Sequence, residues 1–252
     1  MRRIVIVLAL LAFGAGAANA RQAATFKYCT DPSFPPMEYS TTSGKVVGFD
    51  ADMAVALTKT WGGAASPVKT AFPGLIPALS SKKCDAVISG IFITPDRQKQ
   101  AGVVSYMHTH RVLVVRAGNP KGIHSPNQLK GHVVAVQAGT KYEEYLKALK
   151  AKIGFTLQSY PGDNDAVAQV LLGRADAVLT QDTSYAYQSK QHPGKIAVGF
   201  TFAASDQFGI YFRKADAGSI GQQIKDGVAM LKSNGTLAKL ATKYKIPVNT
   251  VK

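Results

Sequence analysis

Strand-like and helix-like segments alternate along most of this chain. Apolar, β-branched runs of about five residues, typical of buried strands, occupy residues 84–89, 133–138 and 175–180. Thr94 followed by Pro95 predicts the start of a helix, because Thr caps helices and Pro fits their first position. Strands that alternate with helices form parallel sheets. The sequence therefore predicts an α/β fold with parallel-type sheets and helices on both faces.

Caps, prolines and glycines set the boundaries of the other predicted elements. Further strands are expected at residues 26–30, 45–47 and 111–116. Helices are expected at residues 48–61, 74–82, 140–150, 163–172, 219–232 and 236–244, besides the one that begins at Pro95.

One unit of this pattern occurs twice. Residues 72–74 read Phe-Pro-Gly and precede a helix and then Asp-Ala-Val at 85–87. Residues 160–162 read Tyr-Pro-Gly and precede a helix and then Asp-Ala-Val at 176–178. A repeated unit of this size predicts two similar lobes.

Strand-like segments at 109–115 and 207–213 flank the second unit, so the chain is expected to cross between the lobes twice, at two hinge crossovers. We expect residues 21–110 and 207–252 to form lobe 1 and residues 111–206 to form lobe 2. Ligands of open α/β sheets bind at the carboxyl ends of the strands, which places a site in the cleft between the lobes.

The composition fits an ordinary folded protein with a basic surface. The chain has 252 residues, of which 46% are hydrophobic, and 30 Lys and Arg against 15 Asp and Glu give a net charge of +15. The basic residues are scattered, and no basic run is interleaved with aromatic residues. We therefore expect a solvated basic surface, no nucleic-acid partner and a monomer.

Residues 1–20 are typical of a cleaved secretory signal peptide. Arg2 and Arg3 precede an apolar stretch over residues 4–18, and Ala18-Asn19-Ala20 provides small residues before the expected cleavage site. The stretch is short for a membrane-spanning helix, and no later one is longer. Removing residues 1–20 leaves 28 basic and 15 acidic residues, a net charge of +13 on the exported chain.

Two cysteines, Cys29 and Cys84, would face an oxidising compartment after export, where a disulfide is permitted. Both lie in apolar strand-like runs, in which buried thiols behave as small hydrophobes. No local pattern brings the two residues within bridging distance. We expect two free thiols.

Polar and aromatic residues follow the predicted strands. Arg97, in the first turn of a helix where the dipole disfavours a cation, suits a ligand carboxylate, and Asp31 suits an ammonium group. Phe34 and Phe72 would cover the ligand, and backbone N–H groups at Gly139-Thr140 would add anion donors. Further strand-end candidates are Ser89, Gly90, Lys141, Gln181 and Asp182. Together these residues predict a site for a zwitterion.

Ordered motifs over the mature chain resemble a known family. They are Cys29-Thr-Asp-Pro-Ser-Phe-Pro-Pro-Met-Glu-Tyr39, Gly48-Phe-Asp-Ala-Asp52, Phe72-Pro-Gly-Leu-Ile-Pro-Ala-Leu79, Cys84-Asp-Ala-Val-Ile-Ser-Gly90, Ile93-Thr-Pro-Asp-Arg97, Ala138-Gly-Thr140 and Gly173-Arg-Ala-Asp176. In this order they resemble the periplasmic polar amino-acid-binding proteins of ABC importers, bacterial extracellular solute-binding protein family 3. The resemblance implies a periplasmic, hinge-bending receptor that closes on one amino acid and delivers it to a membrane permease, without a cofactor.

The resemblance also implies roles for individual residues. Arg97 would bind the ligand α-carboxylate, and Thr140 and Lys141 would close on it from lobe 2. Asp31 would bind the ammonium or side chain, Phe34 and Phe72 would sandwich the side chain, and Ser89 and Gly90 would add polar contacts. Phe92 departs from the family pattern, which often has Ser or Thr there. The family's second-lobe aspartate falls on Gln181, with Asp182 one place later, so either residue remains a candidate.

Two rival functions remain open at this stage. A lyase of the same fold, similar to cyclohexadienyl dehydratase, would need a general acid in the cleft, for which Glu38 and Glu143 are nearest. His108 and His110 would lie on one face of a strand and provide two ligands for a metal-binding receptor. No catalytic motif is present, so we expect no enzyme and no metal site. Basic, neutral polar and acidic amino acids and related amines all remain possible ligands.

Overall fold

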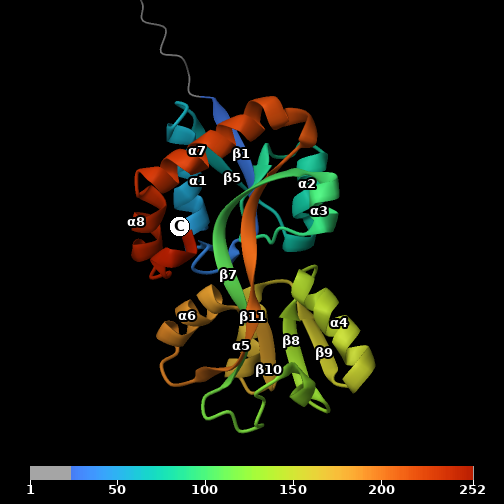
Figure 1. Cartoon of the computed structure of the whole chain (residues 1–252). Coiled ribbons are helices and arrows are strands. Elements are labelled where there is room, and N and C mark those ends of the chain that lie inside the picture. Colours follow the sequence, from blue (N-terminus) through green and yellow to red (C-terminus); the bar gives the residue numbers. More distant parts are fainter. Residues whose placement is uncertain (1–23, 252) are drawn as a thin grey trace, which may run out of the picture.

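A computed structural model describes residues 24–251 and shows two lobes joined by two long strands (Figure 1). The joining strands are β7 (Gly102–Arg116) and β11 (Ile196–Phe212), which run antiparallel to each other from one lobe into the other. The two-lobed α/β fold with two crossovers is therefore confirmed. The predicted signal peptide lies outside the described residues. Within residues 24–251, no helix combines the length and the apolar character needed to cross a bilayer.

Lobe 1 contains the N-terminal elements and the last helices of the chain. Its strands are β1 (Thr25–Thr30), β2 (Ser33–Phe34), β3 (Glu38–Ser40), β4 (Val46–Val47), β5 (Ala64–Lys69) and β6 (Ala86–Val87). Its helices are α1 (Phe49–Lys59), α2 (Leu75–Ser80), α3 (Pro95–Gln100), α7 (Gln222–Ser233) and α8 (Thr236–Lys243), and a 3₁₀ turn at Phe72–Gly74 precedes α2. Figure 1 shows α1, α7 and α8 on one side of β1 and β5, with α2 and α3 on the other.

Lobe 2 is smaller and repeats the same plan. Its strands are β8 (Val133–Gln137), β9 (Thr156–Tyr160) and β10 (Ala177–Gln181), and its helices are α4 (Lys141–Ile153), α5 (Asp163–Leu171) and α6 (Asp182–Gln191). In Figure 1 the helices α4 and α6 lie on opposite sides of these strands.

The strands form one continuous mixed sheet. Its order is β5-β1-β6-β11-β7-β10-β8-β9, and a second, three-stranded sheet has the order β2-β3-β4. Pairing is parallel within each lobe, at β1–β5, β1–β6, β8–β10 and β8–β9. It is antiparallel wherever a crossover strand takes part. The predicted parallel sheets are thus present in each lobe, and the antiparallel crossovers join them.

Local helix signals operate as the sequence predicts. The Thr94 hydroxyl accepts the N–H of Arg97 and caps α3, and the Thr140 hydroxyl accepts the N–H of Glu143 and caps α4. Helices α1, α7 and α8 bury an apolar stripe that includes Leu57 and Leu237. Caps and apolar stripes therefore fix where the helices of this chain begin and which faces they bury.

The structure departs from the predicted elements in three respects. The crossover strands are far longer than the short segments predicted for them, because β7 and β11 pair along almost their whole length. Strand β6 covers only Ala86–Val87 of the predicted 84–89. Strands β2, β3, β5 and β9 and helix α6 were not predicted, since these segments are very short or show no clear apolar periodicity.

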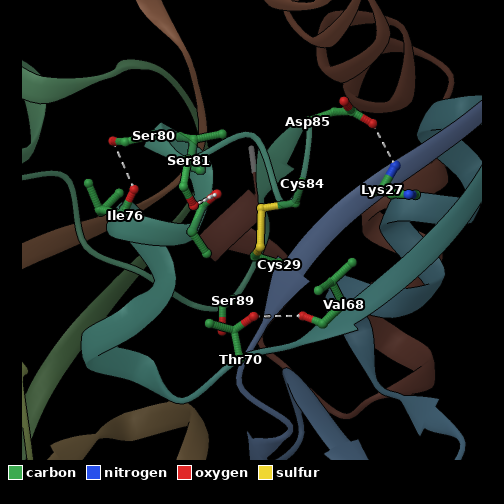
Figure 2. Close-up of a disulfide and its surroundings, with 12 residues drawn as sticks. Lys27, Cys29, Val68, Thr70, Ile76, Ser80, Ser81, Cys84, Asp85 and Ser89 are labelled. Atoms are coloured by element: carbon green, nitrogen blue, oxygen red, sulfur yellow. Dashed lines mark hydrogen bonds between the residues drawn. A yellow bond between two sulfur atoms is a disulfide. The ribbon is translucent and has the colours of Figure 1, made fainter.

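The expectation of two free thiols is wrong. Cys29 in β1 and Cys84 before β6 form a disulfide, with Cα atoms 5.7 Å apart (Figure 2). Parallel pairing of β1 with β6 brings the two residues together, although they are 55 positions apart in the sequence. This distance depends on tertiary pairing, which no local pattern reveals. The bridge ties together the two strands that lead to Asp31 and Ser89.

Removing this disulfide should lower the stability of lobe 1. Closing a loop of this length restricts the unfolded chain and contributes about 4 kcal/mol, which corresponds to a loss of roughly 10 °C in Tm. We expect the Cys29→Ser/Cys84→Ser variant to show this loss by circular dichroism. The wild type under a reductant should match the variant, and the variant should not respond to the reductant. A Tm equal to that of the oxidised wild type would contradict the prediction.

Candidate ligand-binding site

A cavity of about 390 Å³ lies between the lobes. Lobe 1 contributes its α2 and α3 regions, and lobe 2 contributes the start of α4. The lining residues are Phe72, Pro73, Ile76, Pro77, Ile91, Thr94, Pro95, Asp96, Arg97, Gln100, Gly139, Lys141 and Glu144. Of the residues predicted for the site, Phe72, Arg97, Gly139 and Lys141 line this cavity. The N–H of Gly139, predicted as an anion donor, instead donates to Glu143 at 2.9 Å.

Arg97 presents a partly buried guanidinium in the cavity. Its Nη1 donates to the carbonyl of Phe92 at 3.0 Å, and its Cζ lies 5.6 Å from the centre of the Phe72 ring. Burial lowers the pKa of Arg97, but an Arg side chain remains charged at neutral pH. Among residues 24–251, no carboxylate lies within ion-pair distance of it. A desolvated cation with unused donors is suited to bind a carboxylate.

Asp31 lies directly behind Phe72 and connects the lobes. Its Oδ2 accepts the N–H of Phe72 at 3.1 Å and the side-chain amide of Gln137, at the end of β8 in lobe 2, at 2.9 Å. Burial raises the pKa of Asp31 above its ordinary value. Gln137 also donates to the carbonyl of Pro161. Sequence analysis missed Gln137, although its place at the carboxyl end of a predicted strand was a usable signal.

Aromatic side chains fill the contact between the lobes next to the cavity. Phe92 is buried, with its ring centre 5.1 Å from those of Tyr142 on α4 and Phe208 on β11. Phe34 is also buried and meets Phe208 edge to face at 6.1 Å. Phe72 is the predicted aromatic wall that lines the cavity itself. Tyr142 was not predicted as a site residue, because it lies on the apolar face of a helix.

The start of α4 brings Lys141 to the cavity from lobe 2. Lys141 Nζ lies 3.2 Å from Oδ1 of Asp206 on β11, and Arg111 Nε on β7 lies 2.9 Å from Oδ2 of the same carboxylate. The Thr140 hydroxyl donates to the carbonyl of Gln137, besides capping the helix. Lys141 therefore lines the cavity and pairs with a crossover strand, whereas the Thr140 side chain is committed to local structure.

Gln181 and Asp182 lie away from this cavity. Asp182 accepts the Thr109 hydroxyl at 2.6 Å and the N–H of His110 at 3.2 Å, both on β7. Gln181 is buried and accepts the Thr180 hydroxyl. Both side chains thus contact the end of β10 or the crossover strand, and neither lines the space beside Arg97.

A buried carboxylate of lobe 2 that the prediction did not include is Asp163. It accepts the hydroxyls of Thr180 and Ser184, and burial raises its pKa to about 6. Asp163 begins α5, so the helix dipole supports its negative form.

Ser89 and Gly90 form a fixed segment behind Asp31 and Phe34. The Ser89 hydroxyl accepts the N–H of Asp31 at 2.9 Å and donates to Oε1 of Glu38 at 2.8 Å. The N–H of Gly90 donates to Oδ2 of Asp50 at 2.7 Å. Every one of these groups is buried, so the segment holds the site from behind.

The glutamates considered as general acids are held by hydrogen bonds within the protein. Glu38 is buried behind Ser89, and Glu143 accepts the N–H of Gly139 and the hydroxyl of Ser159. The exposed Glu144 is the glutamate that lines the cavity. The part of the chain from 24 to 251 contains no group of three or more His, Cys, Asp or Glu side chains arranged to hold a metal ion.

Two lobes joined by two antiparallel strands, with charged groups of both lobes at one cavity, define a hinged receptor for a small molecule. The comparisons agree with this class. Residues 26–246 match the model of the bacterial extracellular solute-binding proteins, family 3, and the chain belongs to this family.

The chain is similar to many known proteins, including these three. The histidine-binding periplasmic protein of Escherichia coli K12 is 31% identical over 97% of both chains. The putative ABC transporter arginine-binding protein 2 of the same strain is 29% identical over 97% of this chain and 99% of its own. A solved ancestral arginine-binding protein bound to arginine is 31% identical, with a TM-score of 0.83 over 88% of this chain and 99% of that one.

A methyl group at Gly90 should disturb the site locally. Gly90 has φ +47°, and a Cβ atom there would lie 2.6 Å from the Phe34 ring. We expect Gly90→Ala to lower Tm by roughly 5 °C and to shift the Phe34 signals in NMR spectra. The control is Gly218→Ala, an exposed glycine without positive φ and with open space at its Cβ, which should leave both unchanged. If Gly90→Ala and Gly218→Ala had the same Tm and the same Phe34 signals, the close contact of Gly90 with Phe34 would be contradicted.

Proposed function

We propose that this chain is the periplasmic receptor of an ABC importer, and that it binds an amino acid or a related zwitterion between its lobes. The observation that carries the proposal is the partly buried Arg97 guanidinium, which faces the cavity without a carboxylate from residues 24–251. A ligand α-carboxylate would supply the missing charge in a bidentate pair. The names of the relatives, which bind arginine and histidine, support the same ligand class.

The cationic end of the ligand belongs at Asp31. Its carboxylate accepts the backbone N–H of Phe72, and the Arg97 guanidinium lies over the ring of the same residue, so both charges contact Phe72. Among the other predicted site residues, Phe34, Phe92, Ser89 and Gly90 support the Phe72 wall and the Asp31 loop. Lys141 and Thr140 approach from lobe 2. Asp182 accepts hydrogen bonds from β7, and Gln181 accepts one from Thr180. Gln137 donates to Asp31 and is a further lobe 2 residue of the proposed site.

Binding would be coupled to closure of the lobes. The hydrogen bond between Asp31 and Gln137 and the ring contact between Phe92 and Tyr142 both join the lobes and would be lost on opening. A ligand that touches Arg97 and the start of α4 stabilises only the closed form, and its differential affinity drives closure. The closed form is then the one delivered to the permease.

The remaining parts of the proposal concern location and partners. Residues 1–20 would direct export and be removed, leaving a periplasmic monomer that docks on an inner-membrane ABC permease and does not bind nucleic acid. The family and the relatives consist of binding proteins, and no contact among residues 24–251 favours the lyase or the metal-binding receptor. We therefore propose a receptor without enzymatic activity.

A thermal-shift screen with the twenty amino acids tests this function through Arg97. At about 100 times its Kd, a ligand adds about 2.7 kcal/mol to native stability, which raises Tm by roughly 5 to 10 °C. We expect at least one amino acid to do so in wild type and to lose the effect in Arg97→Ala.

The matched control for this screen is Lys99→Ala, which removes an exposed positive charge two residues along the same helix. It should keep the full shift. Calorimetric affinity of Arg97→Ala within a few fold of wild type would overturn the site, and no shift with any amino acid would overturn the ligand class.

A further inference from the structure

Two carboxyl groups, Glu38 on β3 and Asp50 on α1, lie buried behind the site, and neither forms an ion pair with any residue from 24 to 251. Glu38 is 1% exposed and Asp50 is 0% exposed. The titratable groups that face them are Tyr28 from β1, Asp31 directly after β1, Tyr106 from β7 and, through Tyr28, Asp52 from α1. All of these groups are acids. Two ionised carboxylates in such a place would repel each other strongly and lack solvation.

One oxygen of each of the two carboxyl groups lacks a hydrogen-bond partner within the described part of the chain. Glu38 Oε1 accepts the Ser89 hydroxyl, and Asp50 Oδ2 accepts the N–H of Gly90 at 2.7 Å and the Tyr106 hydroxyl at 2.9 Å. The other two oxygens, Glu38 Oε2 and Asp50 Oδ1, are buried and receive no donor from any other described residue. The two side chains lie within hydrogen-bonding reach of each other. A single proton shared between them would give both unpartnered oxygens a hydrogen bond.

The pair holds two consecutive residues of the site. Ser89 is bonded to Glu38 and Gly90 to Asp50, and Ser89 in turn holds the N–H of Asp31. Bonds from two neighbouring residues to two linked side chains form a closed ring. A change in the distance between the carboxyls therefore moves Ser89, Gly90 and the start of the Asp31 loop together.

We propose that Glu38 and Asp50 share one proton, and that this shared proton makes them positioning residues for the Ser89–Gly90 segment and the Asp31 loop. The importance of this positioning for ligand binding rests on the proposed function, whereas the shared proton does not. Two properties follow. Loss of the proton should separate the carboxylates and shift the segment, and an amide should replace either carboxyl but not both.

The amide argument comes from donors and acceptors. In Glu38→Gln the amide oxygen accepts the Ser89 hydroxyl and the amide nitrogen donates to Asp50, as the shared proton does. In Asp50→Asn the amide oxygen accepts Gly90 and Tyr106 and the nitrogen donates to Glu38. In the double variant two NH₂ groups face each other. Flipping either amide would relieve this clash but would remove the oxygen that accepts a hydrogen bond from the Ser89–Gly90 segment. A packing role alone predicts no such difference.

The pH dependence has a definite sign. Burial, followed by the charge of Asp50, raises the pKa of Glu38 well above its ordinary value, and burial raises that of Asp50 to about 6. The native state therefore holds the proton more tightly than the unfolded chain. Its stabilising contribution is full below the unfolded pKa of about 4.5 and is lost as the pH rises through the raised native value. Each single amide variant, which has no shared proton, should lack this loss.

The experiment uses the unliganded protein, so its outcome is independent of which ligand binds. We would measure Tm from pH 5 to pH 9 for wild type, both single amide variants, the double variant and Asp226→Asn, an exposed carboxyl control. At pH 6 we expect each single variant within about 3 °C of wild type and the double variant lower by roughly 10 °C, far more than the sum of the singles. The singles should have a flatter pH slope than wild type and Asp226→Asn.

An NMR titration tests the positioning. The Gly90 amide signal should move with pH in wild type and stay constant in Glu38→Gln. The proposal is overturned if the double variant equals the sum of the singles, if Glu38→Gln keeps the wild-type slope, or if the Gly90 signal titrates equally in both proteins. A failed amino-acid screen would leave these readouts unaffected, so failure of the proposed function can be told apart from failure of this inference.

Discussion

The pairing of β7 with β11 is the constraint on which the rest of the structure depends. These strands run through both lobes, with Gly102 opposite Phe212 at one end and Arg116 opposite Ile196 at the other. The register shifts between Val198 and Phe200, between Thr201 and Ser205, and between Phe208 and Gly209, so the pairing is irregular along the middle of β11. Asp182 and Lys141 of lobe 2 bind the same part of the ribbon, at His110 and Asp206. Movement of the lobes must therefore bend this ribbon and act on the contacts that position α4 and α6.

Arg97 and Asp31 have no oppositely charged partner among residues 24–251. Arg97 is partly desolvated over the ring of Phe72, and the buried Asp31 accepts the backbone N–H of the same residue and the side-chain amide of Gln137. In an open form, water would solvate the Arg97 and Asp31 side chains, whereas in a closed form they would need partners of opposite charge. In the proposed function, a zwitterion would supply both opposite charges while the lobes exclude water. Behind them, the disulfide and the hydrogen bonds of Ser89 hold the lobe 1 strands in fixed relation.

The sequence predicted what local patterns determine. Thr94 and Thr140 cap their helices because an N-cap depends on neighbours within three residues. Phe72, Arg97 and Lys141 reach the cavity because each follows a strand or begins a helix at the cleft edge. The disulfide was not predicted because it depends on parallel pairing of β1 with β6, which are distant in the sequence. Gln137 and the partnership of Glu38 with Asp50 were missed for the same reason.

The most direct test of the account is the distance between the lobes with and without ligand. Spin labels at the exposed Val55 on α1 and Leu172 after α5 would report it, and the buried disulfide leaves its cysteines unlabelled. The account predicts a broad distance distribution for the unliganded protein that narrows to its shortest component when a stabilising amino acid is added, and that no longer narrows in Arg97→Ala. Identical distributions with and without each of the twenty amino acids would contradict it.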